Sequence, residues 1–444
     1  MKKKALALTM AALTAAGMIA GCGSAPAAAT PESAEGGAAA QQQEEQGQAA
    51  ESGEVVELTM WGGWSGDQIA QLEEQLEGFN SSQDRIRITY MAQDTMEQKL
   101  LTAIASNEVP DIVLWDRFNT SVYAPKGALM PLDEYVESDG VDLGQFYEPA
   151  VEELQSGDAL YGIPLTVDTR VIFYNKDLLE EAGVDPASIT DWDSLEEAAV
   201  KLTKWDGSTM VQAGFSLKDA GLFNNWIAQA GGQMIDDSTN PPVTAFNSDA
   251  GLEVLDYWDK LLNEDKVYQL GFEDGLGGDG FKAGKVALTF NGPWVLEQYK
   301  EAGLNFGVIG QPEGPSGQKH AMMGGFGLAI PNGAKHPEEA WEFIKWWTME
   351  PENGVEFCKI SGNMPANKQA AEDPYFADDE VFKVFNEAYG YAGIRSKAFG
   401  YSDVEGLALI PQLQRFMAGE IDAQEALSTA QSQGDAILAE AAQQ

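Results

Sequence analysis

The chain has 444 residues and a formal net charge of −43, with 70 acidic and 27 basic side chains. So acidic a body excludes nucleic acid as a partner, because nucleic-acid binding depends on neutralising phosphates with Lys and Arg. The two Cys exclude a disulfide framework within one chain, and the two His lack the spacing of zinc ligands. The length is sufficient for two or three domains with sizeable cores.

The N-terminus has the features of a secretory signal. Residues 1–21 combine three lysines with an apolar stretch too short to span a bilayer, and they end at Ile19-Ala20-Gly21-Cys22. This tetrad resembles a bacterial lipobox, which implies that Cys22 becomes the lipid-modified first residue. The alternative is ordinary secretory cleavage beside an unrelated Cys. Residues 22–54 are polar and small, and they predict a disordered tether. An anionic membrane would repel this acidic body, so we expect an extracytoplasmic protein anchored by a covalent lipid at Cys22.

The body begins with an alternation of strands and helices. Strands are predicted at 55–60, 86–90 and 110–117, and apolar residues at helical spacing predict a helix in each interval between them. The first strand ends in Trp61-Gly62-Gly63-Trp64-Ser65, where two glycines allow a tight turn and two indoles flank it. This order of elements is typical of a parallel α/β sheet.

A second run of the same kind begins at 161–168. A strand is predicted at 171–175, and Asp193 with Glu196 three residues later is interpreted as a capping box. The Gly- and Asp-rich segment 271–280 lacks the Asp spacing of an EF-hand. We therefore expect it to be an exposed connection, with calcium binding as the weaker alternative.

The next informative stretch is a buried strand followed by a turn. Residues 286–290 are predicted to be a strand buried on both faces, and Asn291-Gly292-Pro293 is turn chemistry that ends it. Trp294 then stands at the carboxyl end of a strand, where open α/β sheets bind ligands. Its indole is a candidate stacking platform, with core packing as an equal alternative. Further on, Pro337 opens an amphipathic helix, and the segment from Pro374 is predicted to be helical throughout.

Four stretches together resemble the extracellular solute-binding proteins of bacterial ABC importers, specifically the sugar-binding group that includes maltose-binding protein. The stretches lie in the family's order along the chain, at 110–118, 161–176, 285–294 and 325–343. The resemblance implies an α/β fold of the two-lobed periplasmic-binding-protein type (type II), with the ligand in the cleft between the lobes. Its hinge is crossed three times, and the crossings fall near 165–168, 307–311 and 361–365. Lobe 1 would be 55–166 and 311–362, and lobe 2 would be 167–306 and 365–444.

The resemblance also implies a set of ligand contacts, spread over both lobes. The residues are Trp61, Trp64, Glu97, Trp115, Asp116, Arg117, Asp168, Trp226, Trp294, Phe326 and Tyr401. Their chemistry suits a sugar, because indoles cover the apolar faces of sugar rings and carboxylates or Arg bind hydroxyl pairs. Two departures from maltose-binding protein, Ser65 in place of an acid and Gly400 in place of a stacking Trp, argue against maltose itself.

Structural alternatives remain open for several of these residues. Asp116 and Arg117 could form a surface ion pair, Asp168 could cap backbone amides at the hinge, and Trp226 could pack in the core. The sequence alone does not choose between these roles and ligand binding.

The expected function is that of the substrate-binding lipoprotein of an ABC importer. It would capture a sugar, an oligosaccharide in particular, by lobe closure and deliver it as a monomer to separate permease subunits, without a cofactor and without catalysis. Two competitors remain: the same fold binding a polyamine or glycerol phosphate, and a secreted carbohydrate-active enzyme such as a glycoside hydrolase. Against the enzyme, no acid pair, nucleophile elbow or metal cluster stands out in the sequence.

Overall fold

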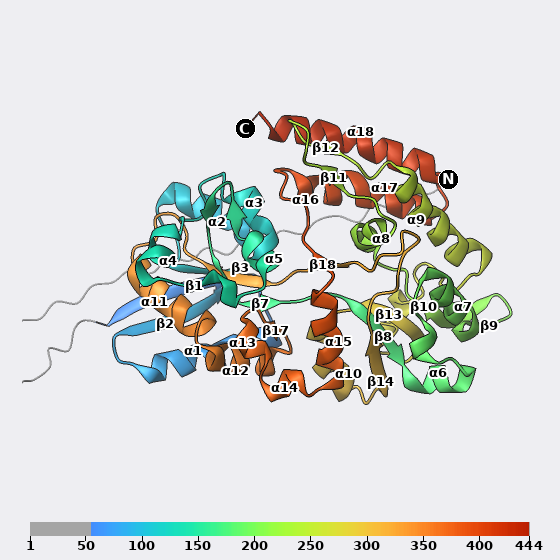
Figure 1. The fold of residues 1–444 in the computed structure, drawn as a ribbon, viewed down its shortest axis with the longest axis horizontal. Helices are drawn as coiled ribbons and strands as arrows, with labels where there is room; N and C mark the ends of the chain where they lie inside the picture. Colours follow the sequence, from blue (N-terminus) through green and yellow to red (C-terminus); the bar gives the residue numbers. More distant parts are fainter. Residues whose placement is uncertain (1–54, 444) are drawn as a thin grey trace, which may run out of the picture. The chain divides into compact units, whose positions relative to one another are not determined.

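The computed structural model describes residues 55–443. The predicted signal peptide (1–21), the lipidated Cys22 and the tether (22–54) lie outside these residues. The described chain contains two five-stranded sheets, each with helices packed on it (Figure 1). We call each sheet with its helices a lobe.

The first sheet has the strand order β2-β1-β3-β16-β6. Its strands are β1 (Val56–Gly62), β2 (Ile86–Ala92), β3 (Ile112–Asp116), β6 (Ile163–Pro164) and β16 (Phe326–Ala329). Strand β1 pairs parallel with β2 and β3, whereas β16 pairs antiparallel with β3 and β6. The predicted parallel unit is therefore confirmed for the first three strands, and a strand from much later in the chain completes the sheet.

Four longer helices cover the first sheet. They are α1 (Asp67–Ser82), α2 (Met96–Ser106), α11 (Pro337–Thr348) and α12 (Pro351–Ser361). Helix α1 buries the predicted apolar stripe of Leu72, Leu76 and Phe79, and Phe79 packs edge-on against Phe343 of α11 with ring centroids 4.9 Å apart. Helical spacing thus places one face of each helix in the core.

The second sheet has the strand order β14-β8-β13-β10-β9. Its strands are β8 (Val171–Asn175), β9 (Lys204–Asp206), β10 (Thr209–Phe215), β13 (Val286–Asn291) and β14 (Phe306–Ile309). Central β13 pairs parallel with β10 and antiparallel with β8. Its first five residues are all buried, which confirms the strand predicted at 286–290.

Helices α6 (Lys176–Ala182), α7 (Trp192–Leu202), α8 (Phe223–Gln229), α9 (Asp249–Asp259) and α10 (Leu296–Glu301) belong to the second lobe. The predicted capping box at Asp193 and Glu196 is wrong. Asp191 caps α7 instead: its carboxylate accepts from the Ser194 N–H at 2.8 Å, and the Ser194 hydroxyl accepts from the Asp191 N–H at 3.0 Å. The helix begins earlier because Trp192 is buried under it, which places Asp193 inside the first turn.

Short ladders lie where the chain passes between the two sheets. Strand β7 (Thr166–Val167) pairs with β17 (Met364–Pro365), and both are labelled between the lobes in Figure 1. The chain passes from the first sheet to the second after β6 and returns after β14. It leaves the first lobe again after α12, toward a helix that packs on β8 and β14. The exact lobe boundaries assigned from the sequence stay a prediction.

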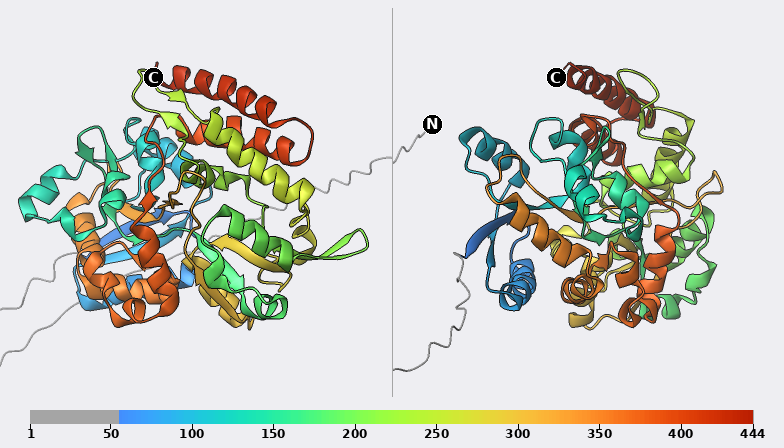
Figure 2. Two further views of the ribbon diagram at one scale, coloured as in Figure 1. Left: turned by 45° about the vertical axis from the view of Figure 1, so that its right-hand side comes forward. Right: turned by 60° about the vertical axis from the view of Figure 1, so that its left-hand side comes forward.

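The C-terminal segment contains helices α13 (Lys368–Ala371), α14 (Pro374–Ala377), α15 (Glu380–Tyr389), α16 (Tyr401–Asp403), α17 (Ile410–Met417) and α18 (Ala423–Ala441). Helix α18 packs along α9 and α17 (Figure 2). The prediction of helix throughout is wrong for 390–400. Here β18 (Ala392–Gly393) pairs with β15 (Ala321–Met322), which uses backbone groups that a helix would need, and Gly400 has a left-handed φ of 98°.

The remaining α-helices and strands are short. They are α3 (Thr120–Tyr123), α4 (Asp133–Asp139), α5 (Glu148–Glu152), β4 (Gln155–Ser156), β5 (Ala159–Leu160), β11 (Ile235–Asp236) and β12 (Val243–Thr244).

Candidate functional site

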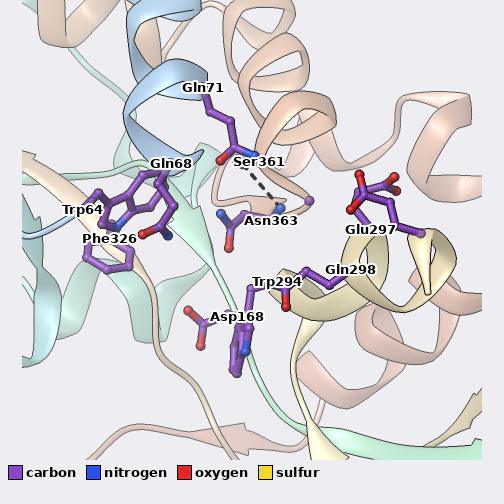
Figure 3. A pocket seen from close by; sticks show the side chains of 12 residues that line it. Trp64, Gln68, Gln71, Asp168, Trp294, Glu297, Gln298, Phe326, Ser361 and Asn363 are labelled. Atoms are coloured by element: carbon purple, nitrogen blue, oxygen red, sulfur yellow. Dashed lines mark hydrogen bonds between the residues drawn. The ribbon is translucent and has the colours of Figure 1, made fainter. Parts of the chain in front are cut away.

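A pocket of about 690 Å³ lies where elements of both lobes meet the β7–β17 ladder (Figure 3). Its lining combines three aromatic rings with carboxylates, amides and a hydroxyl. The lining residues are Trp64, Gln68, Gln71, Asp168, Trp294, Glu297, Gln298, Glu301, Phe326, Ser361, Gly362 and Asn363. Apolar rings beside a few placed polar groups are typical of small-molecule sites.

Trp294 is positioned by the turn that ends β13. The strand stops at Asn291, and Pro293 opens a single 3₁₀ turn (Pro293–Val295) that carries the indole. Gly292 is required here, because a Cβ at this position would lie 2.0 Å from the Trp294 ring. The guanidinium of Arg170 lies over the ring, 5.4 Å from its centroid, while the half-buried indole lines the pocket. The predicted strand and turn are confirmed, and they place this indole at the pocket.

Trp64 faces the pocket from the first lobe, in the loop that follows β1. It is 5% exposed, stacks on Phe357 at 5.7 Å and meets Phe326 edge-on at 5.2 Å. The Tyr90 hydroxyl donates to the Trp64 carbonyl at 3.0 Å, which fixes the loop. Figure 3 shows Trp64, Phe326 and Gln68 gathered on one side of the pocket. This indole is a rigid wall rather than a mobile side chain.

Asp168 marks the point where the hinge strand β7 ends beside β16. Its backbone exchanges two hydrogen bonds with Gly324, at 3.0 and 2.9 Å. A side chain at Gly324 would collide with the carboxylate, since a Cβ would lie 2.7 Å from Asp168 Oδ1. Burial raises the pKa of Asp168, although the nearby Arg117 and Arg170 oppose that rise. Asp168 is only partly buried, so its carboxylate lines the pocket beside Gly324.

A buried ion pair lies behind this wall. Arg117 Nη2 is 3.0 Å from Glu153 Oε2, and the two side chains are 0% and 3% exposed. Arg117 also donates to the carbonyls of Thr166, Gly324 and Phe326, so its guanidinium is surrounded by protein acceptors next to the hinge. Burial raises the pKa of Glu153 to about 7, despite the opposing charge of Arg117. This arrangement is that of a structural pair at the hinge.

The structure brings four of the predicted contacts together and distributes the others. Trp64, Asp168, Trp294 and Phe326 all line the pocket. The roles assigned to all eleven residues stay predictions, because no ligand complex tests them.

Four predicted contacts lie in the interior in this conformation: Trp115, Arg117, Trp226 and Tyr401. Trp115 is 0% exposed and its indole donates to Thr120 Oγ1 at 3.0 Å, and Arg117 is 0% exposed. Trp226 is 1% exposed and packs among aromatic rings of the second lobe. For Trp226, this matches the core-packing alternative that the sequence left open. The surface ion pair proposed between Asp116 and Arg117 is not formed, since Arg117 pairs with Glu153 below the surface.

The remaining predicted contacts lie outside the pocket lining. Trp61 is half-buried on β1, and Glu97 of α2 accepts from Asn119 Nδ2 at 2.8 Å. Asp116 accepts from the Phe118 N–H at 3.2 Å, and burial raises its pKa. Tyr401, which is 1% exposed, also lies outside the lining and donates to Glu405 Oε1 at 3.2 Å.

Sequence reasoning missed several polar residues of the site. Gln68 and Gln71 lie three positions apart on α1 and therefore share one helix face, a spacing that could have drawn attention to them. Asn363 follows the helix-ending Gly362, and its N–H donates to Ser361 Oγ at 3.4 Å.

Within residues 55–443, no group of three or more His, Cys, Asp or Glu is placed to hold a metal ion. In segment 271–280, the carboxylate of Glu273 is buried and accepts from Ser216 Oγ at 2.5 Å and from the Gly280 N–H at 2.7 Å. The side chain of Glu273 therefore has a structural role and is not exposed. In the same described part, no helix is long and apolar enough to cross a membrane.

Comparison with known proteins gives a family match over residues 70–384, to the model described as bacterial extracellular solute-binding protein. The maltotriose-binding protein of Pyrococcus abyssi is 25% identical over 356 residues, which cover 78% of this chain and 74% of that protein. The maltodextrin-binding protein of Bacillus subtilis is 25% identical over 316 residues, which cover 68% and 72%.

Solved structures agree in fold. The structure of CpMnBP1 with mannotriose bound superposes with a TM-score of 0.75 at 27% identity and covers 85% of this chain and 100% of that one. The GacH receptor of Streptomyces glaucescens superposes with a TM-score of 0.76 at 24% identity and covers 87% and 99%. These neighbours have the two-lobed architecture described above.

Proposed function

We propose that this chain, which belongs to the family of bacterial extracellular solute-binding proteins, captures an oligosaccharide and delivers it to the permease of an ABC importer. The family and the relatives are binding proteins, and the names of the relatives refer to oligosaccharides of glucose. The neighbouring CpMnBP1 structure holds mannotriose. These facts support hexose oligosaccharides as the ligand class.

The observation that carries the proposal is the composition of the pocket. Trp64, Trp294 and Phe326 supply flat apolar surfaces, and Asp168 and Asn363 supply polar groups beside them. Sugar rings need both, because their C–H faces pack on aromatic rings and their hydroxyls need acceptors and donors. Closure of the two lobes over the ligand would then follow from contacts that exist only in the closed form.

The non-sugar alternatives are less well matched. A phosphate ester needs cationic groups, and none of the residues that line this pocket in the described chain is Lys or Arg. A polyamine could use Glu297 and Glu301, but both side chains are exposed at the rim, where solvent weakens their charge interactions. Three aromatic rings beside one partly buried carboxylate favour the sugar.

The proposal extends to the N-terminus and the assembly. Cys22 would carry the lipid after removal of 1–21, and the segment to residue 54 would tether the body at the outer face of the cell membrane. The body would act as a monomer with 55–166 and 311–362 as lobe 1 and 167–306 and 365–444 as lobe 2. Incorporation of labelled palmitate, lost in Cys22→Ala together with release of the protein into the medium, tests the anchor.

Titration calorimetry with linear glucose and mannose oligosaccharides tests the ligand class, with spermidine and glycerol 3-phosphate as controls. We expect saturable binding by one oligosaccharide series and recovery of that sugar unchanged. A response to a control compound alone would overturn the sugar assignment. Recovery of shortened sugar would identify an enzyme instead.

A further inference from the structure

An exposed tryptophan lies on the outer strand of the second sheet, away from the pocket. Trp205 belongs to β9, the edge strand of that sheet, and is 38% exposed. Figure 1 labels β9 at the outer end of the second lobe, whereas the pocket lies at the β7–β17 ladder. Single exposed apolar residues are common on protein surfaces, so Trp205 is informative only through its surroundings.

The indole of Trp205 is held in one orientation. Its Nε1 donates to the carbonyl of Lys266 at 3.2 Å, and its backbone lies opposite Met210 in the ladder of β9 with β10. Lys266 has a φ of 54°, a left-handed conformation that is uncommon for a residue other than glycine. Because the ring is already fixed, a ligand that stacks on it costs little conformational entropy.

A hollow of about 280 Å³ lies beside this ring. Leu262, Tyr268 and Met417 are buried and give the hollow an apolar floor, whereas Leu270 is 39% exposed at its edge. The lining residues are Trp205, Leu262, Asn263, Lys266, Tyr268, Gln269, Leu270, Met417 and Ala418. We call this hollow the β9 hollow.

Polar side chains complete the lining of the β9 hollow. Asn263, Lys266 and Gln269 are all exposed, so their polar ends are accessible to a ligand. Asn263 Nδ2 donates to Asp259 Oδ1 at 2.7 Å, which orients that amide. Side-chain amides both donate and accept hydrogen bonds, as sugar hydroxyls do. A fixed indole with an apolar floor and two amides is therefore suited to a sugar ring.

The charge of the β9 hollow differs from that of other hollows of this acidic chain. None of its lining residues is acidic, whereas the 690 Å³ pocket has three acidic lining residues and a hollow of about 420 Å³ between α7 and α9 has five. Its sequence neighbours Asp206, Glu264 and Asp265 do not line it. A cationic ligand would favour the acidic hollows, and the net charge of −43 repels an anionic polymer. A neutral ligand fits the β9 hollow best.

The size of the β9 hollow favours a small occupant. A standard protein–protein interface buries about 800 Å² and about 20–30 residues on each partner. Nine residues around 280 Å³ are far fewer and are close to the lower end of small-molecule sites, about 300 Å³. One or two sugar units match this space better than the surface of a partner protein.

We propose that the β9 hollow is a second carbohydrate site, which binds a neutral glycan outside the pocket between the lobes. One sugar ring stacks on Trp205, and its hydroxyls bond to Asn263, Gln269 and Lys266. The site is open to solvent, so it accepts an internal unit of a long polysaccharide. The inference does not depend on the proposed function, because the β9 hollow and the pocket share no lining residue.

The test is native affinity electrophoresis of the full-length protein. The gels contain glycogen, dextran or galactomannan, three neutral polysaccharides of known composition, or no polysaccharide. We expect at least one polysaccharide to retard the wild-type protein in proportion to its concentration. Trp205→Ala should raise the dissociation constant for that polysaccharide at least about fivefold, because it removes the stacking ring. Trp205→Phe keeps a ring and should lose less.

Three further variants separate the β9 hollow from the fold and from the pocket. Gln269→Ala changes an exposed side chain and should weaken retardation about threefold without loss of stability. Val211→Ala is the matched control, since Val211 is 41% exposed on the neighbouring strand β10 and does not line the hollow. Val211→Ala and the pocket variant Trp294→Ala should both leave retardation unchanged. Thermal unfolding of each variant verifies that it is folded.

Four results would overturn the inference. One is the absence of retardation in every gel, and another is equal retardation of wild type and folded Trp205→Ala. Retardation that is lost in Trp294→Ala but kept in Trp205→Ala would assign the polysaccharide to the pocket. A dimer in sedimentation velocity that Trp205→Ala dissociates would make a second copy of the chain the occupant. None of these results decides the proposed function, which depends on the calorimetry of oligosaccharides.

Discussion

The pocket and the interior behind it use the same residue types in different ways. Trp294 and Trp226 are both indoles of the second lobe, and both were predicted as ligand contacts. Trp226 is 1% exposed and touches the rings of Trp192, Phe215, Tyr257 and Phe290, at centroid distances from 5.1 to 6.1 Å. Trp294 is half-buried, with Arg170 over its ring and the pocket beside it. Residue type therefore does not separate a binding indole from a core indole.

The backbone around each indole determines whether its side chain reaches the pocket. Trp294 follows a turn at the end of β13, so its side chain leaves the sheet and reaches the space between the lobes. Trp226 lies within α8, whose six buried residues hold that helix inside the lobe. The two carboxylates differ as well: Asp168 lines the pocket at the end of β7, and Glu153 is locked to Arg117 behind it. In both comparisons the surroundings of a side chain, not its aromatic or acidic character, decide whether it lines the pocket.

The largest expected effect comes from the interior indole. Trp226→Ala should lower the free energy of unfolding by about 4 kcal/mol, because it removes a large buried side chain and leaves a cavity among four aromatic rings. Trp294→Ala, at the half-buried site, should cost less than about half as much. Denaturant unfolding of both variants measures the two losses in free energy of unfolding. Equal losses would show that the two indoles are equally structural and would remove the contrast drawn above.

A second prediction concerns the buried carboxylate Glu153. Burial raises its pKa in the folded protein to about 7, above its usual value of 4.5, so folding favours the protonated form. Its contribution to stability is therefore complete below about pH 4.5 and is lost as pH rises through 7, a change of about 3 kcal/mol by linkage. Glu153→Gln is neutral at every pH and should remove this part of the pH dependence.

Unfolding free energies of wild type and Glu153→Gln at several pH values between 4.5 and 8 provide the measurement. Glu152→Gln is the matched control, because Glu152 is the preceding residue and its side chain is 48% exposed. It should leave the slope of stability against pH unchanged. If Glu153→Gln and wild type show the same slope, the interior carboxylate does not titrate as its burial requires.

The third prediction addresses the pocket. Trp294→Ala should weaken binding of the sugar by roughly 100-fold, or about 2.7 kcal/mol, since an indole that covers a sugar face contributes through both apolar area and ring geometry. Trp226→Phe, which keeps the interior largely filled, should change affinity by less than about threefold. Calorimetry on the two variants compares them directly. A similar loss of affinity in both would mean that Trp226 contacts the ligand in the closed state.

Sequence reasoning located the parts of the fold that depend on local pattern. The alternation of strands and helices predicted the sheets, and the run from 286 to 294 predicted both the buried strand and the half-buried indole after it. Where one local signal competed with another, the prediction failed. Residues 390–400 lie between helices, yet their glycines and the pairing of β18 with β15 keep them extended.

Burial of the polar candidates could not be predicted, because it depends on distant parts of the chain. Arg117 appears in the sequence beside Asp116, but its acceptors come from Glu153, Thr166 and Gly324. The same holds for Arg395, whose contact with Phe118 joins residues far apart in the chain. The contacts of Arg117 form when the first lobe folds, and that of Arg395 forms only once both lobes are folded. A single sequence carries their residue types but not their proximity.

The smallest effect tests how Trp294 is held. Arg170 lies over its ring in a cation–π geometry, which is worth about 0.5–1 kcal/mol at partly exposed sites. Arg170→Met keeps an apolar stem over the indole but removes the charge, so affinity for the sugar should fall only about two- to fivefold. Arg170→Ala also removes the stem and should cost more than Arg170→Met. If both variants lost as much affinity as Trp294→Ala, the guanidinium itself would bind the ligand, and the pocket would combine aromatic and cationic recognition in a way that its lining residues do not indicate.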